Sequence, residues 1–225
     1  MTVDTDPMPP SGLDLRALVS RLARRTPTRT EADVQADVRD LLLHGGLNLA
    51  AEDLTVQLEA QVGDRRRIDV ETGFTVIEVK KDLRAGTVLA EAVEQLAGYV
   101  AERTKRLNQR YVGVLTDGAD WRCYHLRVDE ELEEVAHHVV DPAQPDPDRL
   151  CVWLEAILAT EAQIRPTPQE IDRRIGADSP GHALERAGLR DLWSLAREAP
   201  EARLKRRLWA RLLTTAFGSQ FADDD

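Results

Sequence analysis

The segment RRIDVETGFTVIEVKKDL, residues 66–83, decides the fold because it combines two strand-like stretches with a turn between them. Residues 66–71 are rich in β-branched side chains, and Thr72-Gly73 supplies a turn. Residues 74–80 are apolar on both faces, which is typical of a strand in the middle of a sheet. The segment therefore predicts two paired strands, the second of them buried.

The chain on either side of this segment favours an α/β fold. Residues 54–62 alternate between apolar and polar side chains, as a strand does, and complete a three-stranded meander. Residues 87–107 follow with apolar side chains at helical spacing. Strand-like patterns return at 110–118, 121–128 and 134–140. We therefore predict a central mixed sheet that is flanked by helices.

Two helices are expected before the sheet. Residues 13–25 place apolar side chains three and four positions apart. Thr30 is a plausible N-cap of the next helix, with Asp33 completing a capping box, and Gly45-Gly46 ends it. Glu31 lies in the first turn of this second helix.

The domain organisation follows from composition. Residues 1–12 contain three prolines and little that could pack, so they are predicted to be a disordered leader. The α/β domain is expected over residues 13–140, and the proline- and aspartate-rich stretch 141–148 is interpreted as a linker. Residues 149–225 show only helical patterns and predict a small all-helical domain.

Charge and hydropathy limit the classes of function. The 225-residue chain has a net charge of -10, which argues against a protein that coats nucleic acid without specificity. Its basic residues occur in local clusters that are compatible with DNA contact, although solvated helix faces explain many of them equally well. No membrane span or signal peptide is evident, so the cytoplasm is the expected location. Two cysteines are too few for a zinc site made of cysteines.

The chemistry expected of residues 66–83 depends on the way side chains alternate between the two faces of a strand. Glu78 and Lys80 are two residues apart and project from one face, while Ile77 and Val79 pack on the other. If the turn folds the preceding strand back, Asp69 comes near Glu78. Two adjacent carboxylates repel unless a cation lies between them, and hard oxygen ligands favour Mg²⁺. Together with Lys80, this pair suits hydrolytic cleavage of a phosphodiester.

These residues resemble a known family. The ID of residues 68–69, the apolar strand and the EVK of residues 78–80, followed by a helix, resemble the PD-(D/E)xK nuclease superfamily of restriction endonucleases. Ile68 replaces the usual proline, and the resemblance covers about residues 28–128. It implies a restriction-endonuclease-like core and in-line hydrolysis that leaves a 5′-phosphate and a 3′-hydroxyl.

Three further features strengthen the resemblance. Many members of the superfamily carry an additional acid where Glu31 lies, although the helix dipole alone also favours an acid there. Gln95 and Tyr99 resemble the QxxxY motif of the nuclease domains of type I restriction motor subunits and of adenine-specific restriction-modification proteins; a polar edge of an amphipathic helix would look the same. Residues 112–126 resemble the strand-turn-strand of the same group, in which Trp121 would be structural.

The resemblance implies a set of site residues. Asp69 and Glu78 would hold Mg²⁺, which Mn²⁺ could replace, with help from Glu31 or from the Val79 carbonyl. Lys80 would position the attacking water. Gln95 and Tyr99 would support the site or the DNA backbone.

Other basic residues are candidates for DNA contact. Arg65, Arg66 and Arg67 precede Asp69 and could touch phosphate, though a charged turn explains them as well. Lys81 is also a candidate. It should point away from Lys80, so it is not the predicted catalytic amine.

Residues 204–225, LKRRLWARLLTTAFGSQFADDD, resemble the helical connector that joins a nuclease to an N6-adenine methyltransferase in single-chain (type IIG-like) restriction-modification enzymes. The chain has no NPPY-like tetrapeptide, no glycine-rich cofactor loop and no GxxxxGK[ST]. The implied partners are DNA, a methyltransferase domain or subunit and a specificity element. The implied setting is restriction of foreign DNA.

Two other hypotheses remain open at this point. The chain could be a catalytically silent module that keeps the nuclease fold for DNA binding or assembly of a larger complex. Alternatively, Glu78 and Lys80 could form an ion pair on an exposed sheet, with a structural role alone.

Overall fold

The computed structural model describes residues 14–47, 57–62, 66–158 and 165–218, with the backbone alone for 57–62, 66–68 and Phe217. The predicted leader lies outside these residues. The chain forms two compact units that divide after Leu184. Within the described residues, none of the helices is both long and apolar enough to cross a membrane.

A six-stranded mixed sheet forms the centre of the first unit, in the order β1-β2-β3-β4-β5-β6. The first three strands are an antiparallel meander, and the last three are also antiparallel to one another. β3 and β4 run parallel, because the helix α3 crosses between them. The predicted mixed sheet is therefore confirmed. The strands are β1 (Gln57–Val62), β2 (Arg66–Thr72), β3 (Thr75–Val79), β4 (Val112–Thr116), β5 (Asp120–Leu126) and β6 (Leu132–Val139).

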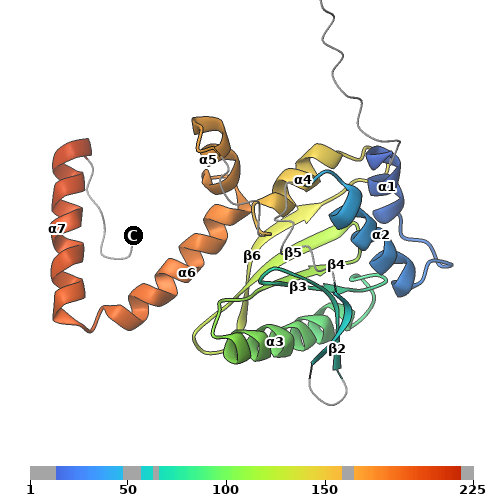
Figure 1. The fold of residues 1–225 in the computed structure, drawn as a ribbon, viewed down its shortest axis with the longest axis horizontal. Coiled ribbons are helices and arrows are strands. Elements are labelled where there is room, and N and C mark those ends of the chain that lie inside the picture. Colours follow the sequence, from blue (N-terminus) through green and yellow to red (C-terminus); the bar gives the residue numbers. More distant parts are fainter. Residues whose placement is uncertain (1–13, 48–56, 63–65, 159–164, 219–225) are drawn as a thin grey trace, which may run out of the picture. The chain divides into compact units, whose positions relative to one another are not determined.

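Helices cover both faces of the sheet (Figure 1). The apolar faces of α1, α2 and α4 form one core with Ile77, Val79 and Trp121. α3 forms a second core on the other face, where Leu96 and Val100 meet Leu115. The helices are α1 (Leu15–Leu22), α2 (Glu31–His44), α3 (Val88–Leu107), α4 (Pro147–Glu155), α5 (Pro168–Ile175), α6 (Pro180–Ala196) and α7 (Pro200–Phe217).

The capping box predicted at the start of α2 is confirmed. The Thr30 hydroxyl accepts from the Asp33 amide at 3.2 Å, and the Asp33 carboxylate accepts from the Thr30 amide at 2.8 Å. This capping box fixes where α2 begins. Glu31 is consequently the first residue of the helix.

The turn between β2 and β3 sets the register on which the candidate site depends. Gly73 adopts a φ of 54°, which suits glycine, and lets Thr72 pair with Thr75. Val70 then pairs with Ile77. One step further along the two strands, residue 69 comes opposite residue 78. All five residues of β3 are buried, as expected of a central strand.

The division of the chain differs from the predicted linker at 141–148. This stretch contains the N-cap Asp146, and its last two residues, Pro147 and Asp148, already belong to α4. α4 contributes Leu150, Trp153 and Leu154 to the main core, so it belongs to the first unit. The proline-aspartate composition of this stretch marks a helix start instead of a break between domains. The sequence analysis also missed α5.

Candidate functional site

The candidate site lies where β3 ends. β2 supplies Asp69, β3 supplies Glu78, and Lys80 follows immediately after β3. The Lys80 amide donates to the Thr116 carbonyl at 2.9 Å, so the backbone remains bound to β4 for one residue beyond the strand. The three predicted residues are therefore held by paired backbone instead of by a loose loop.

Asp69 is held from two sides. Its Oδ2 accepts from the Val79 amide at 2.8 Å, and its Oδ1 accepts from Gln35 Nε2 at 2.6 Å. The first bond comes from the neighbouring strand and the second from α2. Because backbone groups alternate along a strand and Lys80 bonds to β4, the Val79 carbonyl lies on the same side of β3 as Asp69. This is the carbonyl that the sequence analysis named, as an alternative to Glu31, as a further cation ligand.

Glu78 and Lys80 meet on one face of β3. Lys80 Nζ donates to Glu78 Oε1, and it also lies 3.3 Å from Gln95 Oε1. Glu78 is only 1% exposed. Its second oxygen, Oε2, is buried and has no hydrogen-bond partner among the residues that the structure describes. A buried carboxylate oxygen without a partner is costly, so this atom calls for a physical explanation.

α3 extends the polar chain beyond Lys80. Gln95 Nε2 donates to the Tyr99 hydroxyl at 2.7 Å, and Tyr99 is 2% exposed. The two residues are four positions apart and face the sheet together. Gln95 thus connects Tyr99 with Lys80, which places both predicted supporting residues beside the carboxylates.

Glu31 lies at the edge of this group. Its side chain is exposed at the first position of α2, and among the described residues it accepts no hydrogen bond. Its charge nevertheless acts on Asp69, Glu78 and Lys80. The structure brings Glu31 near the other acids without fixing its carboxylate.

Burial and mutual repulsion perturb the pKa values of the two buried acids. Burial raises the pKa of Asp69 to about 6, against the bonds from Val79 and Gln35 and the charge of Lys80. Burial and then the charge of Asp69 raise the pKa of Glu78 to about 7, against its bond with Lys80. For Lys80, burial alone would lower the pKa, but Glu78 and the other two acids outweigh it and the pKa is raised. The group therefore carries more negative charge than one lysine balances.

The donor set fits a hard divalent cation. No group of three or more His, Cys, Asp or Glu side chains arranged to hold a metal ion occurs in the part of the chain that the structure describes. Mg²⁺, however, is commonly bound through one or two carboxylates, with waters and substrate phosphate as the remaining ligands. Asp69 and Glu78 Oε2 could supply the two carboxylate ligands, and the Val79 carbonyl could supply a further oxygen. A cation there would also explain the unpartnered oxygen and the crowding of charge.

Comparisons with protein-family models, with curated protein sequences and with solved structures find no match. The functional argument for this chain therefore depends on the contacts, burial and charge of the group just described.

The predicted DNA-contact residues are less well defined. Lys81 is exposed, and its Nζ donates to the Pro27 carbonyl at 2.9 Å, which ties the loop after β3 to the segment before α2. Arg65 and the side chains of Arg66 and Arg67 lie outside the described residues. Contact of these three arginines with DNA stays a prediction.

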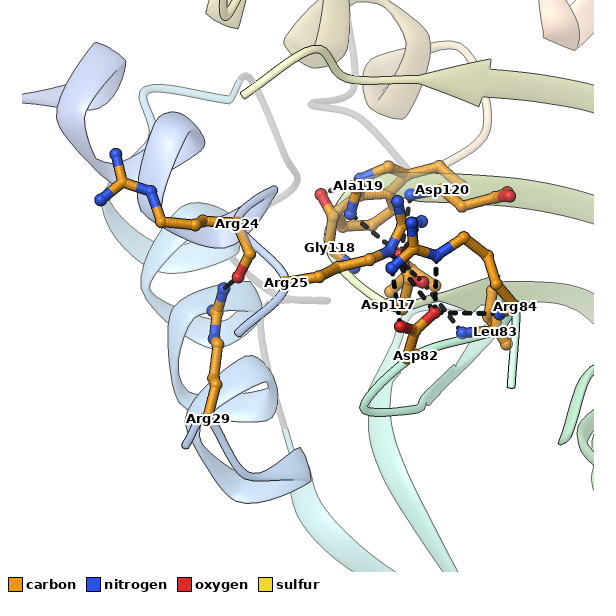
Figure 2. A network of polar contacts seen from close by, with 12 residues as sticks. Arg24, Arg25, Arg29, Asp82, Leu83, Arg84, Asp117, Gly118, Ala119 and Asp120 are labelled. Carbon is orange, nitrogen blue, oxygen red and sulfur yellow. Dashed lines mark hydrogen bonds and ion pairs between the residues drawn. The ribbon is translucent and has the colours of Figure 1, made fainter. Parts of the chain in front are cut away.

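A further buried acid, Asp117, directly follows β4 and lies among Arg25, Asp82 and Leu83 (Figure 2). Its carboxylate accepts from both Arg25 Nε and Arg25 Nη2 at 2.8 Å. It also accepts from the backbone amides of Leu83 at 2.9 Å, Ala119 at 3.1 Å and Asp120 at 2.9 Å. Both oxygens are fully bonded, so Asp117 joins three separate segments of the chain.

This network holds the loop that leaves the candidate site. Leu83 follows Lys80 by three residues, and its amide is fixed by Asp117 from the β4–β5 turn. Arg25, between α1 and α2, also lies 3.7 Å from Asp82. The backbone on both sides of Lys80 is thus fixed, at Thr116 before the loop and at Asp117 within it.

The sequence analysis missed two residues of this region. Gln35 lies four positions after Glu31, so both fall on one face of α2; that spacing was the signal for it. Asp117 sits in the turn sequence TDG, where an aspartate looks like an ordinary turn residue. Its role depends on contacts with Arg25 and Leu83, which are distant in sequence.

Proposed function

We propose that this chain is a Mg²⁺-dependent endodeoxyribonuclease module of the PD-(D/E)xK type, which hydrolyses phosphodiester bonds in DNA. The observation that carries the proposal is the buried Glu78 Oε2, which no described residue hydrogen-bonds and which belongs to a group with Asp69 and Lys80. A buried carboxylate oxygen that accepts no hydrogen bond and lies beside other acids is well suited to bind a cation.

Asp69, Glu78 and the Val79 carbonyl would hold the cation, and Mn²⁺ would substitute for Mg²⁺. When bound, the cation supplies Lewis-acid stabilisation of charge on the phosphoryl group. Gln35 and the Val79 amide keep the Asp69 carboxylate in place. The chain thus prepares the acids before substrate arrives, which reduces reorganisation during the reaction.

Lys80 would act directly on the reacting groups. Its ammonium is charged at neutral pH, because its neighbours raise its pKa. Gln95 and Glu78 hold the Nζ beside the carboxylates. From there it can hydrogen-bond the attacking water and stabilise charge that develops on a phosphate oxygen.

The biological setting is part of the same proposal. The similarity of ID and EVK to restriction enzymes, with the meander, α3 and β4 in that order, supports a restriction-endonuclease-like core. The module would serve restriction-modification or a related defence against phage DNA in the cytoplasm. A methyltransferase and a specificity element would be supplied by other chains or domains.

A purely structural ion pair is the less favoured explanation. That hypothesis assumed an exposed sheet, whereas Glu78 is 1% and Lys80 16% exposed at the side chain. A buried pair stabilises a fold only when its remaining polar atoms are satisfied. Here one carboxylate oxygen is unsatisfied and a second acid, Asp69, lies nearby.

Plasmid cleavage tests the proposal. The full chain should nick or linearise supercoiled plasmid with Mg²⁺ or Mn²⁺ and not with EDTA. Asp69→Ala and Lys80→Ala should each lower the rate by about 100-fold or more, because each removes a group that acts in the transition state. Asp129→Ala and Lys105→Ala, which change exposed residues away from the group, serve as matched controls and should cleave at the wild-type rate.

The same assay separates the alternatives. Cleavage that survives both Asp69→Ala and Lys80→Ala would remove the site from consideration. Tight binding of DNA fragments without cleavage in either metal would favour the silent nuclease-fold module.

A further inference from the structure

The helix α7 has an unusual exposure for its length. It runs over 18 residues, yet none of the residues 200–216 is buried. Most helical stability in proteins comes from a packed apolar face and not from the intrinsic propensity of the residues. Within the described part of the second unit, α7 therefore lacks the contact that would normally hold such a helix.

Large apolar side chains line this open surface. Leu204, Leu208 and Leu212 repeat every four residues on α7, and each is more than half exposed. On α6, Leu189, Leu192 and Leu195 repeat every three residues and are 63% to 65% exposed. We call these six leucines the leucine rows. Rows of this kind mark a surface that binds another apolar surface.

A basic pocket lies where α6 and α7 meet. It has a volume of about 560 Å³ and is lined by one tryptophan, four arginines, one glutamate and one proline. Glu198 is its one acid. The lining residues are Trp193, Arg197, Glu198, Pro200, Arg203, Arg206 and Arg207.

Two arginines of this pocket, Arg203 and Arg207, are available to an acidic ligand. Arg206 lies over the Trp193 ring at 5.1 Å from its centre, which orients the guanidinium at the pocket wall. Arg203 and Arg207 make no ion pair with any residue that the structure describes. α7 as a whole carries five basic residues and a single acid, in a chain whose net charge is -10.

We propose that α6 and α7 bind an acidic, amphipathic helix of a partner protein. The leucine rows would take up the apolar face of that helix, as helix-in-groove recognition does. The pocket arginines would pair with its Asp and Glu side chains, for which the guanidinium geometry is well suited. The surface lies in the second unit, so it adds a partner-binding function to the proposed nuclease function and does not depend on it.

Charge and apolar content decide between possible occupants. A second copy of this surface would bring two strongly basic helices together, which repel. DNA would satisfy the arginines but leave the leucine rows in water. An anionic membrane could accept both features of α7, yet it offers no discrete side chains for a pocket lined by four arginines. An acidic helix satisfies the rows and the pocket together.

Two synthetic helical peptides of equal length test the proposal on the full chain. Both carry leucine at the same helical positions, and their remaining positions are mostly Glu in one and mostly Lys in the other. By fluorescence anisotropy, the acidic peptide should bind at least about tenfold more tightly than the basic one. Leu204→Gln with Leu208→Gln, and separately Arg203→Gln with Arg207→Gln, should each weaken its binding by about tenfold.

Glutamine favours helix, so these variants keep α7 intact, and circular dichroism checks this. Lys105→Gln, on α3, is the matched control and should bind like the wild type. Equal binding of the two peptides, or binding that neither double variant weakens, overturns the proposal. It is also overturned if the leucine variant instead abolishes self-association in sedimentation, or binding to phosphatidylglycerol vesicles or to a DNA duplex, while peptide binding is unchanged.

Discussion

Two acids at the same end of the sheet are equally buried and are treated in opposite ways. Glu78 and Asp117 are each 1% exposed. Asp117 accepts hydrogen bonds from Arg25 and from three backbone amides, so neither of its oxygens is left over. In the described part of the chain, Glu78 accepts from one lysine at Oε1 and from no donor at Oε2.

We propose that the difference separates an acid that holds the fold, Asp117, from one that binds a cation, Glu78. A buried carboxylate with a full set of donors stabilises the chain and leaves nothing with which to bind a ligand. A buried carboxylate with an unfilled oxygen costs stability and is retained where function needs it. Burial alone would not distinguish Asp117 from Glu78; the count of donors does.

The largest expected difference between Asp117 and Glu78 is in how much each contributes to the stability of the fold. Asp117→Ala leaves Arg25 and three amides without their acceptor, so it should lower the free energy of unfolding by about 3–5 kcal/mol. Glu78→Gln removes a charge that is incompletely paired, so without metal at pH 8 it should cost less than about 1 kcal/mol. Urea unfolding of both variants measures the contrast. Equal losses for the two would contradict the distinction.

The pH dependence of stability should show the effect of burying Glu78 and Asp69. Glu78 and Asp69 hold their protons more tightly in the folded chain, because their pKa values are raised to about 7 and about 6. Stability of the metal-free protein should therefore fall as the pH rises from about 4 to 7, by on the order of 5 kcal/mol from these two groups together. Mg²⁺ favours the ionised acids and should restore stability at pH 8.

The difference between wild type and the double variant Asp69→Asn, Glu78→Gln isolates this contribution. His138, whose pKa is lowered by burial, titrates in the same way in both proteins and cancels. Urea unfolding at pH 5 and pH 8 is the measurement. A wild-type loss no larger than that of the double variant would mean that the two acids are not strained by burial.

Replacing Gln35 should have a smaller effect, on metal binding by Asp69 and Glu78. Gln35→Ala removes the donor to Asp69 Oδ1 and should weaken Mg²⁺ or Mn²⁺ binding by about tenfold, as loss of an outer partner of a metal ligand does. Gln144→Ala, which changes an exposed residue before α4, is the matched control and should bind the metal like the wild type. Unchanged metal affinity in Gln35→Ala would show that the bond to Asp69 is incidental.

Much of the sheet could be predicted from the sequence because its signals are local. The alternation of residues 66–80 and the Thr72-Gly73 turn determine the register that brings residue 69 opposite residue 78. The same alternation placed Glu78 and Lys80 on one face. The Thr30 capping box likewise needs only four adjacent residues, and it was predicted correctly.

What could not be predicted depends on contacts between distant segments. Asp117 acquires its role from Arg25 and Leu83, and nothing near it in the sequence indicates either partner. The unfilled Glu78 Oε2 is likewise a property of the packed site. The 141–148 stretch has the composition of a linker, but the apolar face of α4 packs on the core of the first unit. Composition cannot tell where an amphipathic helix will pack.

Direct binding of Mn²⁺ tests the central claim, that Asp69 and Glu78 form a divalent-cation site and Asp117 does not. Electron paramagnetic resonance of the free ion, titrated with protein, measures how much Mn²⁺ is bound. Wild type and the folded Asp117→Asn variant should both deplete the free-ion signal, while the Asp69→Asn, Glu78→Gln double variant should leave it unchanged. Depletion by the double variant equal to that by wild type, or none by wild type at millimolar protein, would contradict the account.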